Sequence, residues 1–294
     1  MLLSILEQGL IFSIMAQGVY ITYRILDFPD MSVDGTFVLG AAIASLLISK
    51  GANPYLATLI AILGGMIGGS LTALLHIKFN ISNILSGILV MLGIYSINLR
   101  IMGKPNIPLF NKTTIFTENF PKIIVILSIA LAVKVLFDRF VKTKLGYLLK
   151  ATGDNHKLVT SLGFNISITK LIGLMLSNGF VALSGAMMSQ YQGFSDITMG
   201  TGTIVMGLAS IIIGESIFKT FSLFSPTTLV ILGAILYKAV IALVLTLGLP
   251  PTDLKLITSV IVVIILAAYS SKNKLLFKGF RLKEKRRASV ASSK

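Results

Sequence analysis

The stretch PYLATLIAILGGMIGGSLTALLHI, residues 54–77, contains no aspartate, glutamate, lysine or arginine. A helix needs about 20 mainly apolar residues to cross a hydrocarbon core roughly 30 Å thick. Of the 294 residues, 54% are hydrophobic and 13% are charged, whereas soluble domains carry roughly 25% charged residues. We therefore predict an all-α integral membrane protein that crosses the cell membrane many times.

The same stretch carries glycines four residues apart, Gly64 with Gly68 and Gly65 with Gly69. Small residues at this spacing let two membrane helices approach closely. The pattern therefore predicts a helix-packing face, either within one subunit or at the seam of a dimer.

Similar apolar runs on both sides of this stretch bring the expected number of transmembrane helices to about nine. The other runs lie near 2–23, 35–49, 81–102, 121–137, 167–190, 202–218, 226–247 and 254–271. The run 35–49 is short, and the polar stretch Asp27–Gly35 before it contains a proline. Non-helical backbone at membrane depth is tolerated where protein or a water-filled cavity satisfies it. We therefore expect broken or re-entrant segments here.

Basic residues between the runs predict the orientation. The stretch 138–170 and the tail 272–294 are rich in lysine and arginine, which marks cytoplasmic segments. Four spans separate them, an even number, so the two assignments agree. The loop 103–120 and the N-terminus then lie outside, and the C-terminus is cytoplasmic. The net charge of +15 is thus assigned to topology and to attraction by anionic lipids, not to nucleic acid.

The composition also argues against chemistry in this chain. There is no cysteine and there are two histidines on unrelated segments, so we expect no metal site. No phosphate-binding loop of the type Gly-x-x-x-x-Gly-Lys-Ser/Thr occurs. No polar cluster offers a nucleophile, a base and an electrophile together, so a membrane-embedded enzyme is a weak hypothesis. We expect no catalytic residue.

An internal repeat connects two distant parts of the chain. The block Phe28–Gly40 resembles the block Phe194–Gly207 when one residue is inserted. Each block follows one apolar run and opens another. Five crossings separate them, so they would enter the membrane from opposite sides. This is the mark of an inverted-topology repeat, whose interface commonly holds a substrate path.

Polar residues in and near this repeat are candidates for lining a translocation path. They are Asp30, Ser32, Asp34, Asn178, Asp196 and Thr198. Each carboxylate also lies near a helix start, where capping of the helix dipole is an alternative role. Asn178 would alternatively hydrogen-bond a neighbouring helix. Arg24 and Asp27 are expected to pair across one helical turn, and Asn98 is placed near the outer membrane surface.

The loop from Thr143 to Asn165 is too long and too polar for a simple turn. Its stretch Asn155–Leu162 is compatible with a short helix, and Gly153-Asp154-Asn155 indicates a turn with capping chemistry. One hypothesis is an amphipathic cytoplasmic helix that fits a groove on a soluble partner. The other is a solvated basic loop that serves topology alone. Periodicity does not separate the two.

The loop resembles the coupling loop of the ABC-importer permeases of the branched-chain amino acid, ribose and nucleoside type. The matching residues are Lys144, Gly146, Ala151, Gly153, Asn155, Gly163 and Asn165, with Asp154 in the same turn. The segment Arg24–Gly35 is similar to a less characterised branch of this family, some members of which are named as tryptophan or tyrosine transporters.

The resemblance implies a permease domain over 1–271, with an ATPase-coupling loop at about 138–166, and a basic cytoplasmic tail over 272–294. Two permease subunits, a cytoplasmic ABC ATPase dimer and an extracytoplasmic substrate-binding protein would import a small polar solute by alternating access. The resemblance to the tryptophan and tyrosine branch implies an aromatic amino acid as that solute. ATP and Mg²⁺ would bind the ATPase, and this chain would hold no cofactor. The alternative is an ion-coupled secondary transporter in which Asp30, Asp34 and Asp196 bind the ion.

Overall fold

The computed structural model describes residues 2–116, 120–218 and 225–246, and single positions between 256 and 267. The chain divides into two compact units, residues 1–240 and 241–294. The last helix begins in the first unit and ends in the second. Apart from the single positions, the predicted span 254–271 and the tail 272–294 lie outside the described residues.

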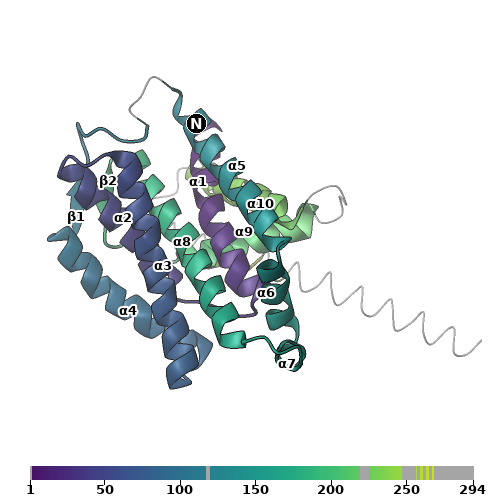
Figure 1. Ribbon diagram of the computed structural model, residues 1–294. Coiled ribbons are helices and arrows are strands. Elements are labelled where there is room, and N and C mark those ends of the chain that lie inside the picture. Colours follow the sequence, from purple (N-terminus) through teal and green to yellow (C-terminus); the bar gives the residue numbers. More distant parts are fainter. Residues whose placement is uncertain are drawn as a thin grey trace, which may run out of the picture. The chain divides into compact units, whose positions relative to one another are not determined.

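Helices make up most of the described chain (Figure 1). The elements are α1 (Leu2–Tyr20), the π-helix η1 (Ile21–Ile25), α2 (Val33–Ser49), α3 (Pro54–Phe79), α4 (Asn83–Met102), β1 (Asn106–Pro108), α5 (Lys122–Val141), α6 (Lys144–Asp154), α7 (His156–Ser161), α8 (Ile166–Gln192), β2 (Phe194–Asp196), α9 (Thr203–Phe218) and α10 (Pro226–Thr246).

Five helices of the described chain are long and apolar enough to cross a membrane. They are Leu2–Ile25, α3, α4, α8 and α10. The apolar helices α2 and α9 have 17 and 16 residues and are shorter than a full span. α5 has 20 residues but is not among the five. Each of these helices falls on a predicted apolar run, with ends displaced by four residues or fewer.

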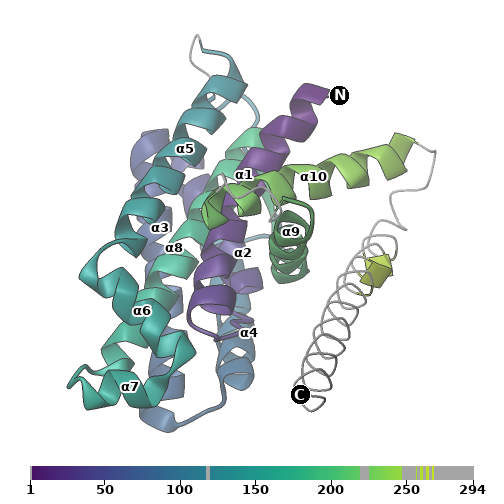
Figure 2. The ribbon, with the colours of Figure 1, turned by 90° about the vertical axis from the view of Figure 1, so that its right-hand side faces the viewer.

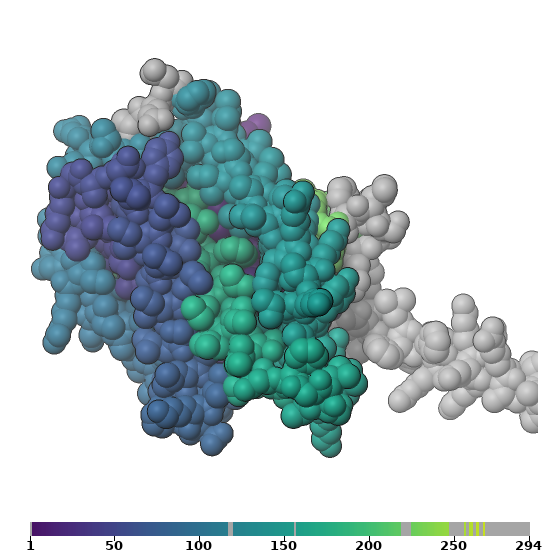
Figure 3. Space-filling model, in the orientation of Figure 1, coloured from purple at the N-terminus to yellow at the C-terminus, as the bar shows by residue number. Residues whose placement is uncertain are grey.

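α8 is the central helix of the first unit and packs against α1, α2 and α3. The contact with α3 is close because Gly65 and Gly69 face the backbone carbonyls of Asn178 and Leu174. A β-carbon at either glycine would overlap these atoms. The glycine pattern of 54–77 is thus a packing face within the subunit, and Figure 3 shows α3 and α8 side by side.

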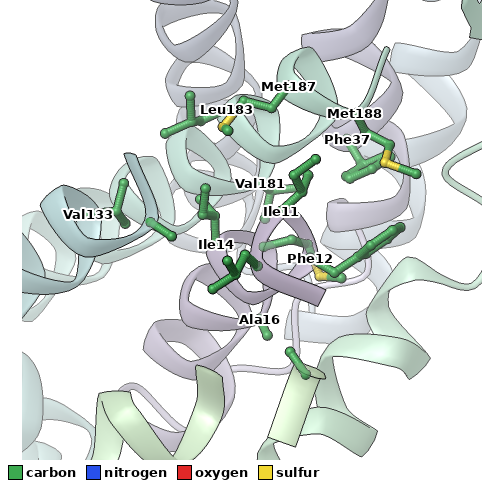
Figure 4. Close-up of a cluster of buried hydrophobic side chains, with 14 of the residues drawn as sticks. Ile11, Phe12, Ile14, Ala16, Phe37, Val133, Val181, Leu183, Met187 and Met188 are labelled. Carbon is green, nitrogen blue, oxygen red and sulfur yellow. The ribbon is translucent and has the colours of Figure 1, made fainter. Parts of the chain in front are cut away.

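The largest buried cluster of the first unit joins α1, α2, α5, α8, α9 and α10 (Figure 4). Phe12 of α1 stacks on Phe37 of α2 with ring centroids 5.8 Å apart. Met187 of α8 and Val133 of α5 are also buried in this cluster. Lipid tails are as apolar as these side chains, so close packing rather than escape from water holds such helices together.

The polar segments contain more structure than the sequence predicts. β1 and β2 pair antiparallel, with Asn106 opposite Asp196, inside stretches that were expected to be loops. The predicted cytoplasmic stretch begins at 138, but α5 continues to Val141. Residues 144–154 form α6, so Gly153 and Asp154 belong to a helix end and not to an open turn. The helix predicted at 155–162 is confirmed as α7.

α6 and α7 lie at the end of the first unit opposite the N-terminus (Figure 1 and Figure 2). The expected pair between Arg24 and Asp27 is wrong. Arg24 instead forms an ion pair with Glu215 of α9, with 3.2 Å between Nε and Oε1. Asp27 lies two residues beyond the end of η1 and has a φ of 50°, so the helix has already ended before it.

Candidate functional site

A buried polar network joins the break before α2 to the middle of α8. The Asn178 amide nitrogen donates to Asp30 Oδ2 at 2.8 Å and to the Leu174 carbonyl at 3.0 Å. Its amide oxygen accepts from Thr36 Oγ1 at 2.6 Å and from Ser32 Oγ at 3.3 Å. Asp30 and Asn178 are 1% and 0% exposed. The predicted inter-helix role of Asn178 is thus confirmed, and the network fixes the break against α8.

The Asp34 carboxylate joins α2 to the first turn of α9. Oδ1 accepts from the Ile204 backbone N–H and the Thr203 hydroxyl, each at 2.9 Å. Oδ2 accepts from the Gly202 backbone N–H at 2.9 Å. The first N–H groups of a helix have no intrahelical partner and carry partial positive charge, so a carboxylate stabilises them. Asp34 therefore caps α9, the helix that begins within the second repeat block.

Asp196 lies at the end of the small strand pair. Its Oδ1 accepts from the Thr198 backbone N–H at 2.8 Å and from the Thr198 hydroxyl at 2.6 Å, and Asn106 Nδ2 donates to Oδ2 at 3.4 Å. Burial raises the pKa of Asp196, but the hydrogen bonds from Thr198 and Asn106 outweigh it, and the pKa is lowered overall.

The two repeat blocks share one local hydrogen bond. In the first block the Ser32 backbone N–H donates to Asp30 Oδ1 at 2.9 Å. In the second the Thr198 backbone N–H donates to Asp196 Oδ1 at 2.8 Å. Both are aspartate turns in which the side chain bonds the backbone two residues on, and each precedes a short apolar helix.

A cavity of about 250 Å³ lies between the start of α2, α4 and the segment 197–201. Asp34 and Thr198 line it, together with Tyr95 and Asn98. Asn98 lies near the C-terminal end of α4, is 1% exposed and donates to the Gly35 carbonyl at 3.2 Å. Its amide oxygen has no hydrogen-bond partner among the described residues.

The six predicted path residues thus fall into three groups. Asp34 and Thr198 line the cavity, Asp30, Ser32 and Asn178 form the network in the core, and Asp196 belongs to the strand pair. Sequence reasoning missed Thr36, which closes the network, and Lys238, which lies within α10. A single charge in the apolar run 226–247 was the available signal for Lys238.

Three side-chain caps build the segment that resembles a coupling loop. Thr143 Oγ1 accepts from the Gly146 N–H at 3.3 Å and begins α6. Asn155 Oδ1 accepts from the Leu158 N–H at 3.2 Å and begins α7. Asn165 Oδ1 accepts from the Ser167 N–H at 2.9 Å and begins α8. The caps explain the two asparagines of the pattern.

The glycines of this pattern serve packing and chain reversal. A β-carbon at Gly153 would overlap the Ile25 carbonyl of η1, and one at Gly146 would overlap the Phe140 carbonyl of α5. Gly163 follows α7 with a φ of 77°, which favours glycine. Lys144 and Asp154 are exposed at the two ends of α6, and Ala151 is half-buried within it.

The segment formed by α6, α7 and the residues just after α7 exposes apolar and basic side chains. Among its exposed apolar side chains, those that are 48–61% accessible are Tyr147, Leu158, Leu162 and Phe164. Its exposed lysines are Lys144, Lys150 and Lys157. We call these seven residues the α6–α7 surface. It combines apolar contact area with positive charge at one end of the unit.

Five apolar helices of membrane-spanning length among the described residues indicate a multi-pass membrane protein. The chain belongs to the family described as "Branched-chain amino acid transport system / permease component", which matches residues 1–268. It is therefore the permease component of a transport system.

Two relatives match over most of their length. The chain is 52% identical over 266 residues to a protein of Clostridioides difficile strain R20291 named "Tyrosine transport system permease protein", covering 90% of each chain. It is 34% identical over 275 residues to an uncharacterized protein of Rickettsia prowazekii strain Madrid E, covering 91% of this chain and 97% of the relative.

Among solved structures, "PsaBC from Streptococcus pneumoniae in complex with Fab" is similar with a TM-score of 0.40 and 14% identity. The match covers 80% of this chain and 88% of that one. A similarity at this level supports no conclusion about helix arrangement or function.

Proposed function

We propose that this chain is the membrane-spanning subunit of an ATP-binding-cassette importer, and that a separate ATPase drives it through the α6–α7 surface. The observation that carries the proposal is this surface. Seven exposed apolar and basic side chains lie on two capped helices and in the turn after α7, at the end opposite the N-terminus. An amphipathic helix face of this kind fits a groove on a soluble partner.

Contacts behind the α6–α7 surface support a transmission route. Gly153 of α6 abuts the Ile25 backbone of η1, and Leu149 of α6 packs in one cluster with Leu26. Four residues after Leu26 comes Asp30, which holds the break against α8. A movement of α6 would therefore reach the break through directly touching groups. π-Helical turns such as η1 occur frequently at functional sites.

The second element of the mechanism is alternating access at the two repeat blocks. α2 and α9 would be half-helices of an inverted-topology repeat that meet where Asp34 caps α9. The equivalent aspartate turns at Asp30 and Asp196 support this relation. Thr198 and Asp34 would line the path where the blocks meet. About nine spans, an outside N-terminus and a cytoplasmic C-terminus complete the proposed topology.

The proposed solute is an amino acid. The family description names branched-chain amino acids, and one relative is named for tyrosine. We favour an aromatic amino acid because that relative is 52% identical over most of both chains.

The proposed assembly contains two copies of a permease, an ATPase dimer that binds ATP and Mg²⁺, and an extracytoplasmic binding protein. This chain would hold no cofactor and would perform no covalent chemistry. Residues 1–271 would form the permease domain, with the coupling loop at about 138–166, and the basic tail 272–294 would lie against anionic lipid.

The test is uptake of labelled L-tyrosine into vesicles that contain the chain with its ATPase and binding protein. We expect uptake to require ATP and to persist when ion gradients are collapsed. Uptake that proceeds without ATP and stops with the gradient would instead support an ion-coupled transporter. In the structure the oxygens of Asp34 and Asp196 already accept protein hydrogen bonds, which favours the importer.

A further inference from the structure

Lys238 is a charged residue well inside the membrane-spanning helix α10. It lies eight residues before the helix end at Thr246, a distance of about 12 Å at 1.5 Å per residue. An extended lysine side chain is too short to bridge that distance to the interface. Placing lysine at the bilayer centre costs about 2.5–3.5 kcal/mol on insertion scales, so such a residue is a functional candidate.

The surroundings of Lys238 are aromatic. Its Nζ lies 3.7 Å from the ring centroid of Phe12, which stacks in turn on Phe37. Both phenylalanines are buried (Figure 4). A ring face attracts an ammonium group but does not neutralise its charge.

No acidic side chain of the described residues pairs with Lys238. The ion pairs found there join Arg24 to Glu215 and Lys134 to Asp138. Lys238 is half-buried. A negative charge to pair with it would therefore have to come from outside the described part of the chain.

Lys122 offers a contrast within the same chain. It also lies over an aromatic ring, that of Tyr191, at 5.8 Å. It is the exposed first residue of α5, so water reaches its charge. Tyr191 donates to Glu7 at 2.9 Å, so a carboxylate is already nearby. Lys122 thus also lies over an aromatic ring, but it is exposed, whereas Lys238 is half-buried and has no ion-pair partner among the described residues.

We propose that Lys238 binds the carboxylate of the transported amino acid as it passes α1, α2 and α10. The inference rests on the proposed function and adds the residue that recognises the solute. A carboxylate supplies the missing negative charge through a charge-assisted hydrogen bond. The Phe12 ring that Lys238 contacts suits a large apolar or aromatic side chain, so the solute class is the amino acids that carry one.

The test compares uptake of L-tyrosine with uptake of L-tyrosinamide, which lacks the negative charge, in vesicles with the complete importer. We expect Lys238→Met to lower the ratio of tyrosine to tyrosinamide uptake about tenfold or more. Lys238→Arg keeps the charge and should retain most of the ratio. Lys122→Met is the matched control and should leave it unchanged.

If Lys238→Met lowers the uptake of tyrosine and of tyrosinamide equally, Lys238 has a structural role and the proposal is overturned. An unchanged uptake of both compounds would also overturn it. If the wild-type importer shows no ATP-dependent uptake of either compound, the proposed function fails first. That result is distinguishable because it appears before any variant is tested.

Discussion

Single residues decide how the breaks in the membrane helices are tolerated. Non-helical backbone at membrane depth requires protein groups to satisfy it. Asn178 fixes the side chains at the break before α2, because its amide donates to Asp30 and accepts from Thr36. The Asp34 carboxylate satisfies the start of α9, because it accepts hydrogen bonds from two backbone N–H groups and one hydroxyl there. Both residues act across a sequence distance of more than 140 residues.

Replacing Asn178 by alanine should destabilise the subunit strongly. The change removes the amide that donates to Asp30 Oδ2 and accepts from the Thr36 and Ser32 hydroxyls, and a buried group left unsatisfied costs about 1–3 kcal/mol. We expect a clear fall in the unfolding temperature of the detergent-solubilised protein. Ser70→Ala is the control, since Ser70 is half-buried and its hydroxyl donates to the Ile67 carbonyl of its own helix. An unchanged unfolding temperature in Asn178→Ala would contradict the network.

At the level of elements, Gly153 allows α6 to pack directly against the backbone of η1. Gly153→Ala should push α6 away from η1, because the added methyl group meets the Ile25 carbonyl. Overpacking of this kind costs about 1–3 kcal/mol. We expect lower thermal stability and slower transport. Gly93→Ala in α4 makes the same change where nothing lies within 4 Å, and should be neutral or slightly stabilising. Equal thermal stability and transport rate in the two variants would contradict the close packing of α6 against η1.

The strand pair β1–β2 should weaken in acid. Hydrogen bonds hold the pKa of Asp196 below its ordinary value, so its ionised form stabilises the folded pair. This contribution is complete above the unfolded pKa of about 3.9 and is lost as pH falls through the lower folded value. Amide hydrogen exchange of residues 194–198 between pH 5 and pH 3, corrected for intrinsic rates, measures it. Asp196→Asn should show little of this pH dependence.

The sequence predicts the helices much better than it predicts their contacts. Long apolar runs define the membrane helices, and Asn155 is recognisable as a cap because its chemistry is local. The strand pair was missed because three-residue strands leave no pattern. The bond from Asp34 to α9 was missed because it depends on how distant segments meet. The glycines of the coupling pattern were identified by resemblance, and their packing role emerges only from the structure.

At the scale of the whole molecule, the α6–α7 surface and the repeat blocks are connected through η1. The connection consists of packed groups, from Gly153 to Ile25 and from Leu26 to the break that contains Asp30. Coupling carried by contiguous contacts depends on both ends. The proposed coupling therefore requires that the ATPase acts on the α6–α7 surface.

The direct test is ATPase association and solute-stimulated ATP hydrolysis with the double variant Leu158→Ser, Leu162→Ser. Both side chains are at least 50% exposed, so the fold should survive their loss. Phe110→Ser, which removes a 71% exposed apolar side chain outside the α6–α7 surface, is the matched control. We predict that the double variant loses ATPase association and stimulated hydrolysis while the control keeps both. Wild-type association and stimulation in the double variant would contradict the proposed coupling.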